Sequence, residues 1–238
     1  MPMKTILLMI LLALTGPSRA ADMAGTGTNA RMDAYLAAAV KHDHFIGTVL
    51  VAKDGAPVLK RSYGMANYEW SVPNSPDTVY RIGSLAKQFT AMLIMQLQER
   101  GALSVSDGIC KYLTPCPEDW HPITLRHLLT HTSGIPSYTR LPDWDERISR
   151  LPQTREGLVA NFRDLPLEFP PGENFRYNNS GYYLLGMVIE RVSNQAYADV
   201  LQANILTPLG MAHTGYDRQR LLLPKRAAGY DWSGNGFV

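Results

Sequence analysis

The spacing of apolar residues predicts a helix followed by a β-hairpin near the start of the chain. The first periodic segment predicts a helix over 31–40, whose apolar side consists of Met32, Leu36, Ala39 and Val40. Two apolar runs, 45–52 and 58–63, then flank the sequence Lys53-Asp54-Gly55-Ala56. An Asp-Gly pair between apolar runs is a strong hairpin signal, because both residues accept the backbone angles of a tight turn. We therefore expect two antiparallel strands after the first helix.

Helical spacing dominates the rest of the chain. A loop rich in Pro, Asn and Ser over 71–77 and a short strand-like segment over 80–83 lead to a helix that begins at Ser84 and stops at Gly101. The predicted apolar face of this helix consists of Leu85, Phe89, Met92, Leu93 and Leu97. The region 103–211 is loop-rich, and its further helices are predicted over 125–130, 154–162, 180–192 and 196–206.

The first 20 residues have the pattern of a secretory signal peptide. Lys4 precedes an apolar core over 6–14, and small residues end at Ala20. The apolar core is too short to cross a bilayer as a stable helix. We therefore predict cleavage after Ala20, a periplasmic or secreted protein without a membrane span, and a mobile leader over 21–30. An uncleaved anchor is the alternative.

Cleavage would also change the charge of the chain. It would remove two of the 23 basic residues and none of the 21 acidic ones, so that the mature charges balance. A balanced charge gives no reason to expect a nucleic-acid partner. The oligomeric state is not indicated by the sequence.

Two cysteines, Cys110 and Cys116, lie close together in a loop that contains proline. Export to an oxidising compartment would favour a disulfide between them. The spacing does not fix the distance between their Cα atoms, so a bridge and two free thiols both stay open. Without neighbouring histidines the pair is a poor zinc site. We expect neither a metal nor an organic cofactor.

Ser84 and Lys87 are the first candidate catalytic pair. Residues three apart at the start of a helix lie on one face, one turn apart. An amine held near a hydroxyl can take its proton and make the oxygen a nucleophile. The alternative for so short a pattern is a capping serine and a surface lysine. This is the only serine in the chain that has a lysine three residues later.

Tyr177 and Asn179 form the second candidate pair, just before the predicted helix over 180–192. A tyrosine whose pKa is lowered by nearby cations can relay a proton. An asparagine amide can orient a lysine or a substrate carbonyl. The alternative is a core tyrosine followed by a helix cap.

Other histidine patterns favour structural roles. His127 and His131 are four apart, as in a zinc-binding helix, but Leu128 replaces the glutamate of that motif. His42-Asp43-His44 is most simply a solvated turn.

Taken together, residues 44–231 resemble the serine β-lactamase and penicillin-binding-protein superfamily, specifically its class C β-lactamase-like group. That group also includes D-Ala-D-Ala carboxypeptidases and esterases. The resemblance is carried by the segments 78–91, 128–136, 171–179 and 208–211. It implies an α+β fold of the β-lactamase/transpeptidase type, in which an antiparallel sheet is flanked by helices and joined by a mostly helical region, with the site between them.

The resemblance also implies the roles of the candidate residues. Ser84 would be the acylated nucleophile and Lys87 its proton acceptor, while Tyr177 and Asn179 would fill the second motif. Asn178 stands where many members have serine or alanine, which would alter the fit of the substrate. The domain would cover 31–238, with a sheet-side segment over 31–100 and the mostly helical region over 101–215.

The family's third motif is a Lys/His-Thr/Ser-Gly strand near the C-terminus, which this sequence does not reach. The residues His213-Thr214-Gly215 match this motif in type, but they follow the segment 208–211 directly, which the family places ahead of its later strands, and so we predict a loop. We therefore expect the domain to lack its C-terminal strands. The leading hypothesis is an exported serine hydrolase that cleaves a small β-lactam, a D-Ala-D-Ala-type wall peptide or an ester. The alternatives are an inactive remnant that binds a partner or wall peptide, and a chain that does not fold stably.

Overall fold

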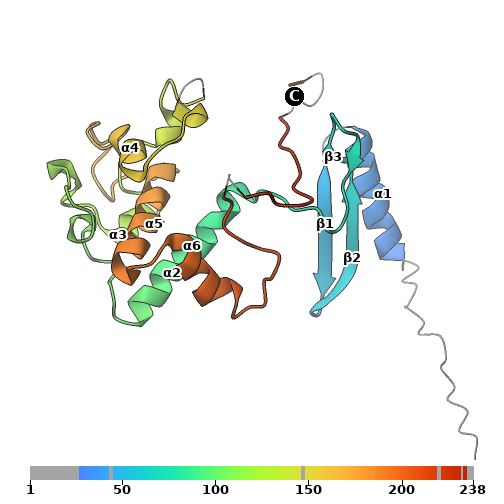
Figure 1. Ribbon diagram of the computed structural model, residues 1–238, viewed down its shortest axis with the longest axis horizontal. Coiled ribbons are helices and arrows are strands. Elements are labelled where there is room, and N and C mark those ends of the chain that lie inside the picture. Colours follow the sequence, from blue (N-terminus) through green and yellow to red (C-terminus); the bar gives the residue numbers. More distant parts are fainter. Residues whose placement is uncertain (1–26, 43–44, 146–147, 219–220, 232, 235–238) are drawn as a thin grey trace, which may run out of the picture. The chain divides into compact units, whose positions relative to one another are not determined.

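The computed structural model describes residues 27–42, 45–145, 148–218, 221–231 and 233–234, which form two compact units (Figure 1). The first unit contains the described residues up to Thr78 and those from Lys225 onward, and the second is Val79–Pro224. The predicted division into a sheet-side segment over 31–100 and a helical region over 101–215 stays a prediction. The predicted signal peptide lies outside the described residues, as does most of the leader. No helix among the described residues is long and apolar enough to cross a bilayer.

The first unit begins with a helix and a hairpin, as predicted. Helix α1 (Gly27–Lys41) is followed by the antiparallel strands β1 (Gly47–Lys53) and β2 (Ala56–Tyr63). The turn residues Asp54 and Gly55 have φ angles of 52° and 77°, as a tight hairpin turn requires. Asp33 of α1 accepts hydrogen bonds from Arg61 and Tyr63 of β2, at 2.6 Å and 2.7 Å. These bonds fix the helix against the hairpin (Figure 1).

Two expectations for this unit were wrong. Helix α1 starts inside the predicted leader, at Gly27, although Gly27, Thr28 and Asn29 have low helix propensity. Strand β4 (Val72–Pro73) lies inside the predicted loop and pairs antiparallel with β3 (Met65–Asn67). Strands of two or three residues are too short to show the alternation of apolar and polar residues that predicts a strand. The segment after Lys225 returns to it, and the Ala228 N–H donates to the Ala66 carbonyl at 2.8 Å.

The second unit is helical. Its α-helices are α2 (Lys87–Glu99), α3 (Leu125–Leu129), α4 (Arg155–Ala160), α5 (Asn179–Ser193) and α6 (Tyr197–Leu201). Single turns connect them: η1 (Gly83–Ala86), η2 (Ile109–Lys111), η3 (Glu118–Trp120), η4 (Tyr138–Arg140), η5 (Ile148–Arg150) and the π-helical η6 (Gln202–Leu206). Helix α5 is central and contacts α2, α3 and α6 (Figure 1).

The core of this unit forms around the apolar face of α5. Its buried residues include Leu184, Leu185, Val188 and Ile189 of α5 together with Leu93, Ile94 and Leu97 of α2. Complete burial of one such side chain stabilises a fold by about 1.5–3 kcal/mol. The packing of α2 on α5 also decides where the first residues of the two helices lie relative to each other.

The buried face of α2 differs from the predicted one. Leu85 and Met92 are exposed, and the buried positions are Thr90, Leu93, Ile94 and Leu97. The regular helix begins at Lys87, after the 3-10 turn η1, and the approach over 80–83 is not a strand. The buried position of Thr90 could not be recognised from the spacing of apolar residues, because threonine is polar. Its hydroxyl is tolerated in the core because it forms a 2.8 Å hydrogen bond with the Tyr197 hydroxyl.

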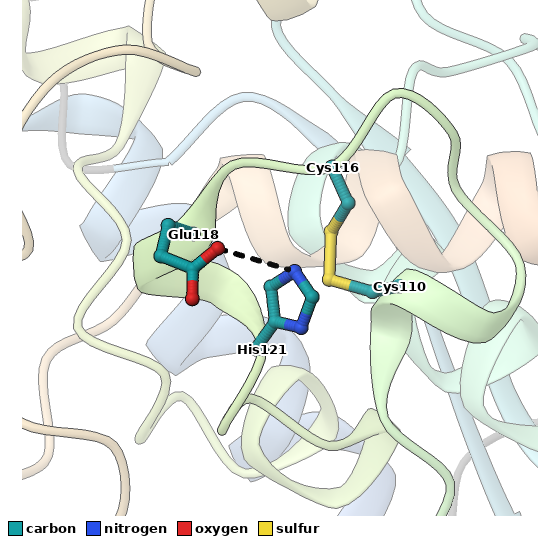
Figure 2. Close-up of a disulfide and its surroundings, with 4 residues drawn as sticks. All are labelled: Cys110, Cys116, Glu118 and His121. Carbon is teal, nitrogen blue, oxygen red and sulfur yellow. Dashed lines mark ion pairs between the residues drawn. A yellow bond between two sulfur atoms is a disulfide. The ribbon is translucent and has the colours of Figure 1, made fainter.

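Cys110 and Cys116 form a disulfide, which decides between the two alternatives that the sequence left open (Figure 2). Their Cα atoms are 5.4 Å apart, and both residues pack against the core. Glu118 and His121 lie beside the bridge, with the His121 Nε2 3.9 Å from the Glu118 Oε2, and form an ion pair when the histidine is protonated (Figure 2). The disulfide ties η2 to the start of the segment that carries η3.

Candidate active site

Ser84 and Lys87 lie one turn apart, where η1 passes into α2. Gly83 has a φ angle of +50°, which an L side chain rarely adopts, and so it lets the chain turn sharply into η1. Ser84 lies inside the 3-10 turn and Lys87 is the first residue of α2. The Lys87 Nζ donates to the Ser84 Oγ at 3.2 Å. The predicted pair is therefore in contact.

The second predicted pair reaches the same place from α5. Tyr177 precedes this helix, and its hydroxyl lies 2.5 Å from the Ser84 Oγ. Asn179 is the first residue of α5, and its Oδ1 accepts a hydrogen bond from the Lys87 Nζ at 2.7 Å. The four predicted residues thus form one hydrogen-bonded cluster within the second unit, although 89 intervening residues separate Lys87 from Tyr177.

Lys87 is surrounded by groups that suit a cation or a proton acceptor. Its Nζ lies 4.7 Å from the centre of the Tyr177 ring and 5.5 Å from that of Tyr182. Such ring faces attract an ammonium group. Together with the bonds to Ser84 and Asn179, these contacts hold the Lys87 side chain in one position.

The Tyr177 hydroxyl is tuned by its neighbours. Partial burial raises the pKa of this phenol, but the hydrogen bonds of Lys87 and Ser84 and the positive charge of Lys87 act in the opposite direction and prevail. The net pKa of Tyr177 lies below its usual value. A phenol whose pKa is lowered toward neutrality exchanges protons more readily.

The orientation of the Asn179 amide is fixed by two residues of the segment around η4. Its Nδ2 donates to the Thr139 Oγ1 at 2.8 Å, and its backbone N–H donates to the Ser137 Oγ at 3.1 Å. Since the amide nitrogen faces Thr139, the amide oxygen faces Lys87. Thr139 therefore determines which end of the amide the lysine meets.

Asn178 is buried at the start of α5. Its side chain is 3% exposed and caps α5, accepting from the Gly181 N–H at 2.7 Å. Its Nδ2 donates to the Ile135 carbonyl. Capping side chains of this kind are worth about 1 kcal/mol. The asparagine at this position, where many members of the family have serine or alanine, serves as the N-cap of α5.

Three residues near the cluster were not predicted to support it. His131 packs against the Tyr177 ring, Arg140 donates to the Tyr177 carbonyl at 2.7 Å, and Thr139 holds Asn179. Only His131 carried a signal, because it lies inside one of the segments that carry the family resemblance. The contacts of Arg140 and Thr139 arise from tertiary packing and leave no pattern in the sequence.

The remaining histidine patterns have ordinary roles. His127 completes a capping box with Thr124 at the start of α3. The described residues contain no cluster of three or more His, Cys, Asp or Glu side chains that could hold a metal ion. His213 lies in a turn and Thr214 and Gly215 are irregular, in agreement with the predicted loop. His42-Asp43-His44 falls largely outside the described residues.

Comparison with known proteins agrees with this geometry. The family model described as Beta-lactamase matches residues 32–238. Penicillin-binding protein 4* of Bacillus subtilis (strain 168) is 35% identical over 200 residues, which cover 83% of this chain and 43% of the relative. The chain thus spans less than half the length of this curated relative.

Solved structures give the same result. The octameric penicillin-binding protein homologue from Pyrococcus abyssi has a TM-score of 0.76 at 34% identity, with 88% of this chain and 49% of that chain covered. A class C beta-lactamase in complex with cefoxitin has a TM-score of 0.67 at 25% identity, with 87% and 56% covered. The predicted β-lactamase/transpeptidase-like α+β fold is confirmed. Because the family model matches nearly the whole sequence, this chain belongs to the beta-lactamase family.

Proposed function

We propose that this chain belongs to an exported serine hydrolase that forms an acyl-enzyme on Ser84. The observation that carries the proposal is the double contact of the Ser84 Oγ, which lies 2.5 Å from the Tyr177 hydroxyl and 3.2 Å from the Lys87 Nζ. A serine hydroxyl beside groups that can exchange protons with it is the general arrangement of an activated nucleophile.

The reaction follows from these contacts. The Ser84 Oγ attacks a carbonyl carbon while the coupled pair of Lys87 and Tyr177, with one of its two groups deprotonated, takes the hydroxyl proton. The carbon–nitrogen or carbon–oxygen bond of the substrate then breaks, Tyr177 returns the proton to the leaving group, and the acyl group stays on the Ser84 Oγ. Water, activated by the same pair, cleaves this ester, so that the carboxylic acid leaves and the serine is restored.

Asn179 supports both steps by position. Its Oδ1 holds the Lys87 Nζ at 2.7 Å, which keeps the amine beside the nucleophile. Fixed placement of reacting groups accounts for a large share of enzymatic rate, because small displacements cost about 10²-fold. No metal or organic cofactor has a part in this proposal.

The substrate is a β-lactam, a D-Ala-D-Ala-type peptide or an ester. All three offer a carbonyl carbon with a leaving group to the same nucleophile. The names of the relatives refer to penicillin binding and to a beta-lactamase, which favours the first two. Export is supported by the signal-like pattern over 1–20 and by the Cys110–Cys116 disulfide, since disulfides persist in oxidising compartments.

Intact mass spectrometry tests this proposal. The purified chain is incubated with a fluorescent penicillin and, separately, with a fluorophosphonate, beside the Ser84→Ala variant. We expect a covalent adduct with at least one probe that the variant does not form. A cooperatively folded chain that forms no adduct with either probe would contradict the proposal and favour a binding protein without turnover.

A further inference from the structure

His131 lies directly beside Tyr177, although the reaction above does not use it. The centre of its ring is 4.7 Å from that of Tyr177, 5.1 Å from that of Tyr182 and 5.9 Å from that of Phe175. Its backbone has a φ angle of +60°, a left-handed conformation that is uncommon for residues other than glycine and in which asparagine, aspartate and histidine are the most frequent of these. The chain is therefore bent at this residue so that the ring faces the turn before α5.

The imidazole also makes one specific hydrogen bond. Its Nδ1 accepts from the backbone N–H of Asn178 at 3.2 Å. Asn178 is the residue between Tyr177 and Asn179, so this bond anchors the turn that presents both side chains to Lys87. An imidazole nitrogen that accepts a hydrogen bond carries no proton, and the ring proton must then lie on Nε2.

The backbone of the same segment is held from His131 as well. The carbonyl of His131 accepts from the N–H of Arg176 at 2.9 Å. The turn over 176–178 is thus bound to one residue at two points, with the Tyr177 ring against the imidazole between them. Removal of the side chain would delete the bond to the Asn178 N–H and the ring contact with Tyr177, and would leave the backbone bond of Arg176.

We propose that His131 is a positioning residue, whose neutral Nε2–H imidazole holds the turn of Tyr177 and Asn179 in the geometry that acylation of Ser84 needs. The inference rests on the proposed function, because it assigns a role in the same site. His131 itself contacts neither Ser84 nor the expected position of the reacting carbonyl; it acts through Tyr177 and the Asn178 N–H.

The surroundings keep this ring neutral. The titratable groups that face it are Lys87 of α2, Tyr177 of the turn and Tyr182 of α5, and none of them is a carboxylate. Burial and then the positive charge of Lys87 lower the pKa of His131. Protonation therefore needs a more acidic solution than for a free histidine. It would remove the acceptor of the Asn178 N–H and place a second positive charge near Lys87.

Two variants separate the parts of this role. His131→Asn keeps an acceptor near the Nδ1 position and suits the left-handed backbone, while His131→Phe keeps a ring and removes the acceptor. If the cost of a buried N–H without a partner falls on the acylation step, the rate constant falls by about 5- to 150-fold. We expect the acylation rate constant to fall at least about fivefold in His131→Phe and to stay within about threefold in His131→Asn.

The pH profile gives a readout that a purely structural role would not move. The wild-type acylation rate should fall on the acidic side as His131 becomes protonated, and this part of the acidic limb should be absent in His131→Asn. A His131→Phe variant as fast as the wild type, or a His131→Asn variant as slow as His131→Phe, would overturn the inference.

Nuclear magnetic resonance tests the inference independently of activity and of any variant's folding. In the ¹⁵N-labelled wild-type chain at neutral pH, a long-range correlation spectrum connects the ring nitrogens of each histidine with the protons on its ring carbons. This spectrum should show His131 as the Nε2–H tautomer. A proton on Nδ1, or a charged ring, would overturn the inference whether or not the chain is acylated. If the chain shows the Nε2–H tautomer but forms no adduct, this result would count against the proposed function and not against the position of the imidazole.

Discussion

At the scale of single residues, the site is a chain of hydrogen bonds in which each side chain has one orientation. Thr139 orients the Asn179 amide, Asn179 holds Lys87, and Lys87 contacts the Ser84 hydroxyl that Tyr177 also reaches. The sequence pointed to the four residues that meet here and to which we assign chemical roles, because serine, lysine, tyrosine and asparagine at these spacings form recognisable motifs. It did not predict Thr139, because no motif in the sequence distinguishes a threonine that accepts such a hydrogen bond from other threonines.

Removal of the Tyr177 hydroxyl should slow acylation without unfolding the chain. Tyr177 is 40% exposed, so Tyr177→Phe loses little packing but leaves the Ser84 Oγ without its 2.5 Å partner. Loss of a proton-transfer group costs about 10²–10⁴-fold in rate. Stopped-flow acylation by a fluorescent penicillin measures the effect, with Tyr35→Phe on an exposed tyrosine of α1 as the matched control. A Tyr177→Phe rate within a factor of three of the control would count against the assigned role.

Thr139→Val tests whether the amide orientation matters. Valine has nearly the shape of threonine but cannot accept the hydrogen bond from the Asn179 Nδ2, so the amide is free to present its nitrogen to Lys87. We expect acylation to slow by about tenfold with little change in the melting temperature. Thr130→Val, which removes an exposed hydroxyl at the end of α3, is the control. Equal rates in the two variants would show that Thr139 does not orient the site.

At the scale of elements, the accuracy of prediction followed the strength of the local signal. The hairpin of β1 and β2 was predicted because its Asp-Gly turn is decided by local backbone angles. The buried face of α2 was predicted wrongly because the single 3-10 turn before Lys87 and the hydrogen bond of Thr90 depend on tertiary contacts. The two-residue strand β4 was missed for the same reason.

The loop between α2 and α3 offers a pH-dependent test of one element. The Asp107 carboxylate accepts from the Tyr112 hydroxyl, the Ser104 N–H and the Lys111 ammonium, and these bonds lower its pKa from 3.8 to about 2. A carboxyl whose pKa is lower in the folded state stabilises the fold above its unfolded value, and this stabilisation is lost as the pH falls through about 2.

Asp107→Asn should therefore lower the melting temperature at neutral pH and have much less effect near pH 2. Circular dichroism melts of both chains between these two pH values measure the difference. A gap between the melting temperatures that stays constant across this range would show that the carboxylate charge does not stabilise the loop.

At the scale of the whole molecule, the described chain has two units, and the four proposed catalytic residues all belong to one of them. The second unit holds the proposed nucleophile, the proposed proton acceptors and the helices that position them. The chain spans less than half of the curated relatives it matches, and so the activity of the entire protein is a proposal. What the described chain supplies is the hydrogen-bonded cluster to which we assign the nucleophile.

Export is a prediction about the whole chain. Expression of residues 1–238 in a bacterium should direct the protein out of the cytoplasm and remove the first 20 residues, because their pattern is that of a cleavable signal. Cell fractionation and N-terminal sequencing measure the outcome, and the mature protein should begin at Ala21. A chain that keeps Met1 and stays in the cytoplasmic fraction would contradict the prediction.

The most direct test of the central claim is to find the residue that carries the acyl group. Trypsin cuts after Arg81 and Lys87 and releases the peptide Ile-Gly-Ser-Leu-Ala-Lys, in which Ser84 is the only hydroxyl residue. Tandem mass spectrometry of the penicillin-treated or fluorophosphonate-treated chain should place the added mass on Ser84 in this peptide. An adduct on a different residue, or an unmodified peptide from a folded and treated chain, would contradict the account.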